Sequence, residues 1–241
     1  MASTDRDLQD EVIRYLSDGS LRNFDIILLD PEEANRARRF SRFLARRYYR
    51  DRLSRGFRYV RMLIPKFSVE QLIDSPGFDS ILGECVLGSF NTSSLVAEFA
   101  VSALRTAQPQ PWWSELLEYE RAFFLQLATS EFAPAAAFPR KQLSTVLHAF
   151  DIPISELLSR IRGKAELESI SRGQSILLFS RTQHGTIYAA ELDSLTANVF
   201  ASVDGISTSR EIAARCALSE AEVDRILQML ADIGSIALPQ R

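Results

Sequence analysis

The chain has few of the side chains that form catalytic and metal centres. Its 241 residues include two cysteines and two histidines, which are too few and too scattered for a metal site. We expect Cys85 and Cys216 to be small buried residues rather than a disulfide, His148 to be half-buried and His184 to lie solvated in a turn. No Gly-rich phosphate loop or nucleophile motif is present. The sequence therefore predicts no catalytic residue, no metal ligand and no cofactor in this chain.

Long apolar runs and a strong excess of one charge are also absent. No stretch of about 18 apolar residues is long enough to cross a membrane, and the polar, acidic start is unlike a targeting peptide. The net charge of −3 does not favour a polyanionic partner. With unpaired cysteines, these features predict a cytoplasmic protein that does not bind membranes and argue against nucleic acid as a partner.

The residues that are present divide the chain into three parts. Residues 1–130 have helical periodicity and predict an N-terminal helical domain, with a long helix over 31–65 that Gly56 can break or kink. Residues 131–165 are expected to connect the two domains and to contain a helix, over 144–163. The remaining helices are expected at 5–19, 68–75, 77–90, 93–107 and 112–128.

Arginine is concentrated in one of these helices. Eleven arginines fall between positions 36 and 61, interleaved with aromatic residues. Such a helix fits an acidic protein surface, and it equally fits a helix whose arginine stems pack along the core while their charged ends stay solvated. Of the paired tryptophans, we expect one in the core and the other in the core or at an interface. The residues that we predict for a partner interface are Arg46, Arg47, Tyr49, Arg50, Trp112 and Trp113.

Residues 166–241 predict a winged-helix-like domain with a small antiparallel sheet. Apolar runs at 175–181 and 185–192, joined by polar residues and a glycine, are typical of a hairpin. Three helices follow, and each begins at a residue suited to N-capping: Asp193, Thr208 and Ser219. Residues 235–238 are expected to form a short closing strand. The fold class is therefore mainly α, or α+β.

The charge of the third helix in this domain decides between two kinds of ligand. A helix that enters the DNA major groove normally carries lysine or arginine. This helix carries one arginine, Arg225, against four acids: Glu220, Glu222, Asp224 and Asp232. The first two also suit a helix N-terminus, but the surface remains unsuited to DNA. It favours an extended peptide bound by strand addition.

Three stretches of the chain resemble known proteins. Residues 191–216, ELDSLTANVFASVDGISTSREIAARC, resemble the PqqD-type peptide-recognition element of ribosomal peptide pathways. Residues 46–63 and 111–124 resemble the partner subunits of multinuclear non-haem iron oxidases, which combine a helical domain with such an element. Within that family, the resemblance is to the partner subunits of 3-thiaglutamate biosynthesis, whose complexes excise the β-carbon of a C-terminal peptidyl cysteine.

The resemblance implies a non-catalytic subunit that docks on an iron-dependent oxidase subunit (TglH-like) through residues 1–130, with the iron in that enzyme. Residues 166–241 would hold the leader of a precursor peptide as an added strand against the third helix. Two of the site residues have ordinary alternatives, because Ile187 suits a core position and Arg225 can pair with Glu222. The site residues carried over are Thr186, Ile187, Tyr188, Ala189 and Ala190, facing Arg225, Gln228 and Met229.

Two other functions remain open from the sequence. The arginine-rich helix together with a winged helix would suit a nucleic-acid-binding regulator. An enzyme of an unrecognised type is the third hypothesis, since a missing motif argues less strongly than a present one.

Overall fold

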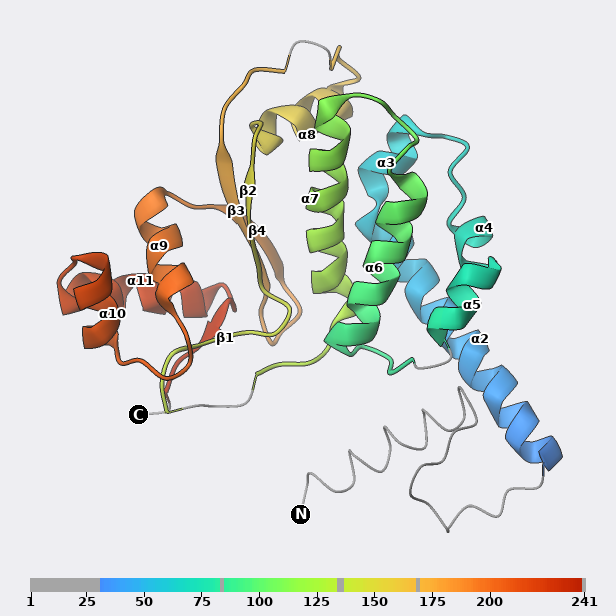
Figure 1. Ribbon diagram of the computed structural model, residues 1–241, viewed down its shortest axis with the longest axis horizontal. Helices are drawn as coiled ribbons and strands as arrows, with labels where there is room; N and C mark the ends of the chain where they lie inside the picture. Colours follow the sequence, from blue (N-terminus) through green and yellow to red (C-terminus); the bar gives the residue numbers. More distant parts are fainter. Residues whose placement is uncertain (1–30, 83–84, 134–136, 168–169, 240–241) are drawn as a thin grey trace.

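The computed structural model describes residues 31–82, 85–133, 137–167 and 170–239 (Figure 1). The helix expected at residues 5–19 lies outside the described residues. The fold is mainly helical with a small antiparallel sheet, as the sequence predicts. None of the described helices combines the length and apolar character that crossing a membrane requires.

The N-terminal part is a bundle of helices. The predicted break at Gly56 is confirmed, because α2 ends there and α3 begins at Arg58. Gly56 is needed at this point because a Cβ there would lie 2.8 Å from the Cβ of Phe124, so that α2 and α7 can approach closely only with glycine. The helices are α2 Pro31–Gly56, α3 Arg58–Leu63, α4 Val69–Ile73, α5 Pro76–Leu82, α6 Phe90–Leu104 and α7 Pro111–Ala128.

The C-terminal part contains two small sheets and four helices within the described residues. Strands β2, β3 and β4 form an antiparallel sheet in that order, and β1 pairs with β5. The elements are β1 Arg140–Lys141, β2 Val146–Phe150, α8 Ile154–Gly163, β3 Ser175–Arg181, β4 Ile187–Glu191, α9 Ser194–Ser202, α10 Ser209–Cys216, α11 Glu220–Asp232 and β5 Ile236–Ala237.

Strand β2 corrects the sequence analysis, which predicted helix from residue 144 to 163. Only α8 is helical there, and residues 146–150 pair with β3, with Val146 opposite Phe179 and Phe150 opposite Ser175. Periodicity cannot separate a short apolar strand from a helical turn, and here pairing with β3 decides. The segment expected to be a connector thus supplies the third strand of the sheet. His148 is half-buried, as expected.

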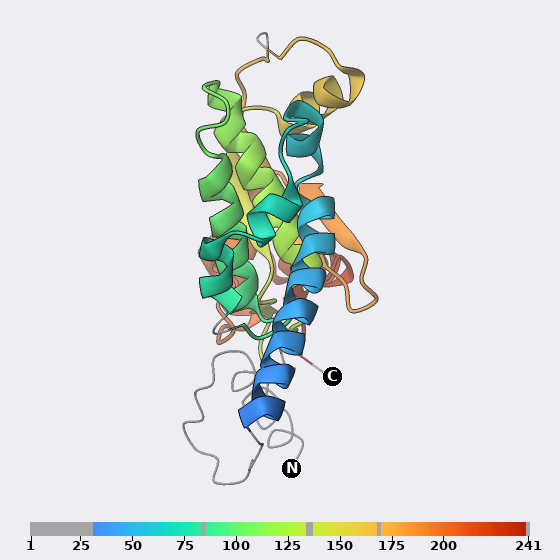
Figure 2. The ribbon, with the colours of Figure 1, turned by 90° about the vertical axis from the view of Figure 1, so that its right-hand side faces the viewer.

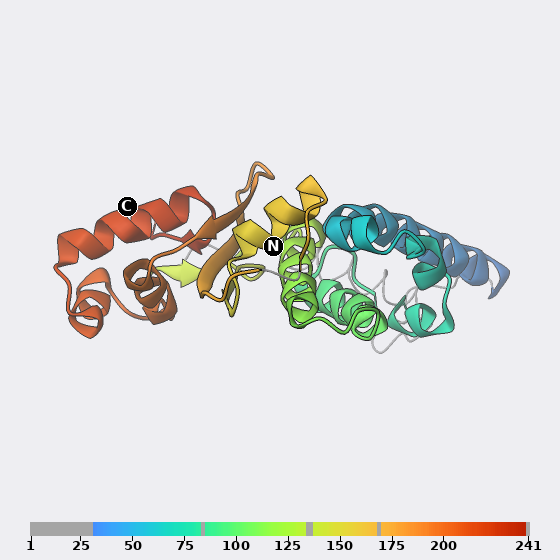
Figure 3. The same ribbon diagram turned by 90° about the horizontal axis from the view of Figure 1, so that it is seen from above.

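Strand β3 is the centre of the molecule because both faces of the sheet are covered. Leu177 and Phe179 point into a core shared with α7 and the other N-terminal helices. Leu178 points the opposite way, into a second core formed with α9, α10 and α11. Figures 1 and 3 show the sheet between these two helical layers. The alternation of a strand explains why this strand reads as one continuous apolar run.

The three C-terminal helices begin as the sequence predicts. The side chain of Asp193 accepts from the N–H of Thr196, and Thr208 and Ser219 each form a capping box. Gly234 follows α11 with a φ of +75°, and a Cβ there would lie 2.5 Å from the carbonyl oxygen of Arg181. Glycine is therefore required both for the left-handed turn and for the contact with β3.

Candidate functional site

Strand β4 is an edge of the central sheet. It pairs with β3 on one side, and no strand in the described part of the chain pairs with its other side. The β3–β4 hairpin projects beyond the helices beside it (Figure 2). An exposed edge of this kind is a template for another extended chain.

The hydrogen bonds of the hairpin show which backbone groups of β4 point outward. The N–H of Thr182 donates to the carbonyl of Thr186 at 2.9 Å, and the N–H of Leu192 donates to the carbonyl of Ile176 at 2.8 Å. In an antiparallel pair, residues whose backbone N–H and C=O groups point toward the partner strand alternate with residues whose backbone groups point away from it. The even-numbered residues of β4 therefore form the backbone hydrogen bonds to β3. The N–H and C=O groups of Ile187, Ala189 and Glu191 face away from the sheet, where an added strand would bind.

The register also assigns the side chains of β4 to the two faces. Tyr188 and Ala190 are opposite Ser180 and Leu178, on the face that packs against the C-terminal helices. Ile187 and Ala189 are opposite Arg181 and Phe179, on the face toward α7. The prediction that the whole set 186–190 faces α11 is therefore wrong for Ile187 and Ala189. The side-chain period of two in a strand makes this unavoidable. Thr186 precedes β4 and is exposed.

The predicted residues of α11 lie on its solvent-exposed face. Arg225, Gln228 and Met229 are exposed, and the amide of Gln228 donates to Asp232 at 2.8 Å. Among the described residues, no hydrogen bond, salt bridge or ring contact joins these three to β4. The helix is instead tied to β3, because the hydroxyl of Ser180 donates to the carbonyl of Ile233 at 2.8 Å. Figure 3 shows α11 and the hairpin on the same side of the molecule.

The acidic character of α11 is confirmed. Its four acids, Glu220, Glu222, Asp224 and Asp232, are exposed. The carboxylate of Glu222 accepts from the hydroxyl and the backbone N–H of Ser219, and these hydrogen bonds lower the pKa of Glu222. No salt bridge joins Arg225 to Glu222 in the described part of the chain, although the positive charge of Arg225 also contributes to the lowered pKa of Glu222.

Some of the residues predicted for a partner interface are buried and others are exposed. Tyr49 is 0% and Trp113 is 2% exposed, so neither lies on a surface, and their assignment to an interface is wrong. Tyr49 belongs to a buried stripe with Ala45 and Leu53, spaced by four residues along one helix face. The indole N–H of Trp113 donates to the carbonyl of Leu104 at 2.9 Å.

The remaining interface residues do not form one surface. Arg47 and Arg50 are exposed on α2, and Arg46 forms a salt bridge with Asp79 of α5. The hydroxyl of Tyr48 donates to the carbonyl of Ala128 at 2.7 Å, at the end of α7. Trp112 is half-buried and lies at the start of α7. Sixteen residues at 1.5 Å each separate it from Ala128, so the two ends of α7 are roughly 24 Å apart.

Sequence reasoning missed the apolar side chains that α2 exposes. Phe40 and Phe43 are 60% and 55% exposed, and Leu44 is also exposed. They lie beside Arg47 on the helix, away from the buried stripe. The sequence contained a signal for this exposure. Ala45, Tyr49 and Leu53 are spaced by four residues and share one face of the helix, so Phe43 and Leu44 must lie on other faces.

Titratable side chains are sparse and dispersed. No three histidine, cysteine, aspartate or glutamate side chains within the described ranges lie close enough together to hold a metal ion. Burial raises the pKa of the Cys85 thiol to about 12, so it remains protonated at neutral pH and is a poor nucleophile. Cys216 is half-buried, with its sulfur 3.4 Å from the Ser202 hydroxyl.

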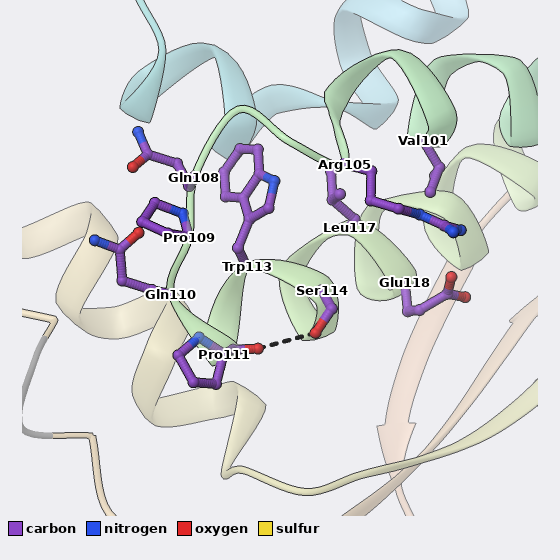
Figure 4. Close-up of a pocket in the computed structure, with 10 residues that line it drawn as sticks. All are labelled: Val101, Arg105, Gln108, Pro109, Gln110, Pro111, Trp113, Ser114, Leu117 and Glu118. Carbon is purple, nitrogen blue, oxygen red and sulfur yellow. Dashed lines mark hydrogen bonds between the residues drawn. The ribbon is translucent and has the colours of Figure 1, made fainter.

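A cavity of about 370 Å³ lies where α6 turns into α7 (Figure 4). Its polar lining includes Arg105 and Glu118 on one side. Glu118 already forms a salt bridge with Arg121 at 2.7 Å. No residue of β3 or β4 is among those that line the cavity. Its lining residues are Val101, Arg105, Gln108, Pro109, Gln110, Pro111, Trp113, Ser114, Leu117 and Glu118.

No protein-family model matches the chain, and no curated protein matches its sequence.

Proposed function

We propose that this chain is a non-catalytic cytoplasmic partner of an iron-dependent peptide-modifying oxidase. It binds the leader of a ribosomally made precursor peptide and presents the core of that peptide to the enzyme. The proposed core ends in a cysteine, as in 3-thiaglutamate biosynthesis. The C-terminal part acts as the winged-helix-like, PqqD-type recognition element, and the iron belongs to the oxidase.

One observation carries the proposal. The outer edge of β4 presents three residues, Ile187, Ala189 and Glu191, whose backbone donors and acceptors face away from the sheet. An extended peptide pairs with such an edge through its main chain. Two strands, β3 and β4, followed by three helices, α9 to α11, is also the order expected of the recognition element. The acidic α11, whose end is bonded to β3 through Ser180, supports a peptide over a nucleic acid.

The surface that docks the enzyme is proposed to be the exposed side of α2. Phe40, Phe43 and Leu44 expose apolar area there, next to the exposed cations Arg47 and Arg50. Aromatic residues and arginine are favoured where one protein binds another. An acidic, partly apolar surface on the oxidase would complement it.

Calorimetry with the precursor peptide encoded beside this chain tests the proposal. We expect the leader part of the peptide to bind the purified full-length chain, alone or in the presence of the oxidase. The absence of binding under both conditions would remove the proposal.

The variant Ala189→Pro tests the mode of binding. Its N–H faces outward and is not used by β3, so proline removes one donor to the peptide while sparing the β3–β4 ladder. We expect at least a tenfold loss of affinity for the leader with little change in thermal unfolding. Ala189→Ser, which keeps the N–H and adds only one small atom, is the matched control and should bind the leader nearly as well as the natural chain.

A second candidate function is supported by the arginines of α2. An exposed row of cations and aromatic side chains also suits single-stranded nucleic acid, and this would make the chain a nucleic-acid-binding regulator. Its affinity would then fall steeply with salt. A flat titration with duplex and single-stranded DNA at low salt would eliminate this function.

A further inference from the structure

We infer that the helical domain supplies a second wall of the peptide site, where Arg58 pairs with an acidic side chain of the bound strand. The inference rests on the proposed function and extends it to the side-chain chemistry of the peptide. Alternate side chains of an added strand point to opposite faces of the sheet. One set faces α11, and the other set faces the corner between α3 and α7.

A chain of contacts leads from β4 to Arg58. Ala189 is opposite Phe179 in the register, and the ring of Phe179 meets the ring of Tyr119 edge-on, with centroids 5.3 Å apart. Tyr119 stacks with Phe123 at 6.4 Å. The guanidinium of Arg58 lies 5.3 Å from the centroid of the Phe123 ring. The corner is therefore on the same face of the sheet as Ala189.

Side chains along this path are open to solvent. Ala189 is exposed and has only a methyl group, and Phe123 is half-buried rather than enclosed. A strand added at about 4.8 Å from β4 would direct every second side chain to the face of the sheet on which Phe123 and Arg58 lie.

The charge of Arg58 is not balanced by a carboxylate. Arg58 is exposed; its guanidinium donates to the hydroxyl of Tyr59 at 3.2 Å and lies 4.7 Å from the centre of that ring. It forms no salt bridge within the described residues. The nearby carboxyl of Glu120 is fully buried, and its two oxygens accept from the backbone N–H groups of Tyr59 and Val60. Burial raises the pKa of this carboxyl, and the charge of Arg58 lowers it in part. An exposed cation held over two rings is complementary to an acidic peptide side chain.

Selection from a phage-displayed library of random twelve-residue peptides, on the immobilised full-length chain, tests the inference. We expect the enriched peptides to share an aspartate or glutamate at one position and to lose binding to Ala189→Pro. Arg58→Glu should weaken their binding at least tenfold. Arg61→Glu is the matched control, because it makes the same change of charge on the same helix at a side chain that donates to Ser54; it should weaken binding less than threefold.

A charge exchange makes the test specific. Replacing the shared acid of the peptide by lysine should abolish binding to the natural chain and restore it on Arg58→Glu. Equal midpoints of thermal unfolding for Arg58→Glu and Arg61→Glu show that both variants are folded.

The outcomes separate the two proposals. Peptides that bind through the β4 edge but respond equally to Arg58→Glu and Arg61→Glu overturn the second wall and leave the proposed function intact. A library without binders, or binders indifferent to Ala189→Pro, contradicts strand addition and therefore both proposals. A concentration-dependent dimer in sedimentation that Ala189→Pro abolishes would assign the edge to a second copy of this chain and overturn the inference.

Discussion

Glu120 is a fully buried carboxyl that connects α7 to the start of α3. Its two oxygens accept from the backbone N–H groups of Tyr59 and Val60. These are donors that the first turn of a helix cannot satisfy internally, and Phe57, the N-cap residue, offers no side-chain acceptor. The two hydrogen bonds favour the carboxylate, whereas burial opposes it. Burial dominates and raises the pKa from 4.5 to about 8.

The direction of the pH effect follows from these two values. Above pH 4.5 the unfolded chain loses this proton, while the folded chain keeps it until about pH 8. Folding therefore becomes less favourable across this window, and the stabilising contribution present at pH 4.5 is lost by pH 8. At about 1.4 kcal/mol for each pKa unit, the difference of roughly 3.5 units amounts to about 5 kcal/mol, which is a large part of a typical domain stability.

The variant Glu120→Gln removes this dependence because its amide does not titrate. One carbonyl oxygen replaces two acceptors, so at pH 5 we expect the variant to be less stable by about 1–3 kcal/mol, the cost of one unsatisfied buried donor. At pH 8 to 9 the variant should equal or exceed the natural chain. Urea unfolding of both proteins from pH 5 to 9, followed by tryptophan fluorescence, measures the free energies. The difference between the two curves cancels the other titrating groups, and a difference that stays constant or favours the natural chain more at high pH refutes the reasoning.

Three further predictions concern stability and are read by chemical or thermal unfolding. Gly234→Ala should destabilise by more than about 2 kcal/mol, because it combines a φ of +75° with a clash on the carbonyl of Arg181; Gly163→Ala, with nothing within 4 Å, should cost little. Ser180→Ala should cost about 1–2 kcal/mol by removing the hydrogen bond to Ile233. Ser219→Ala should cost about 1 kcal/mol through loss of the α11 cap, and an unchanged midpoint would contradict that role.

Local signals predicted the starts of the C-terminal helices well because each signal acts within a few residues, whereas the helix predicted over 77–90 ends at Leu82. The caps at Asp193, Thr208 and Ser219 and the stop at Gly234 depend only on backbone groups nearby. The break at Gly56 was likewise visible as a glycine inside an arginine-rich helix, although the reason for it, the close approach of Phe124, was not.

Features that depend on long-range pairing were not predictable. Strand β2 exists because residues 146–150 find β3, and the sequence there fits a helix equally well. Which of Tyr188 and Ala189 faces the C-terminal helices depends on the register of β4 with β3. Arg58 escaped notice because it was one of eleven similar arginines, and only folding brings it beside Phe123.

The position of β3 determines what the proposed site can do. One of its ends is fixed to the helical domain, because the guanidinium of Arg181 donates to the carbonyls of Gln126 and Thr129 at the end of α7. The preceding residue, Ser180, donates a hydrogen bond from its hydroxyl to the carbonyl of Ile233 at the end of α11. A peptide paired with β4 would therefore be held at a fixed position relative to both layers, including the side of α2 that is proposed to dock the oxidase. In the proposed complex, each peptide residue beyond the paired strand would extend the reach toward the oxidase by no more than about 3.3–3.6 Å.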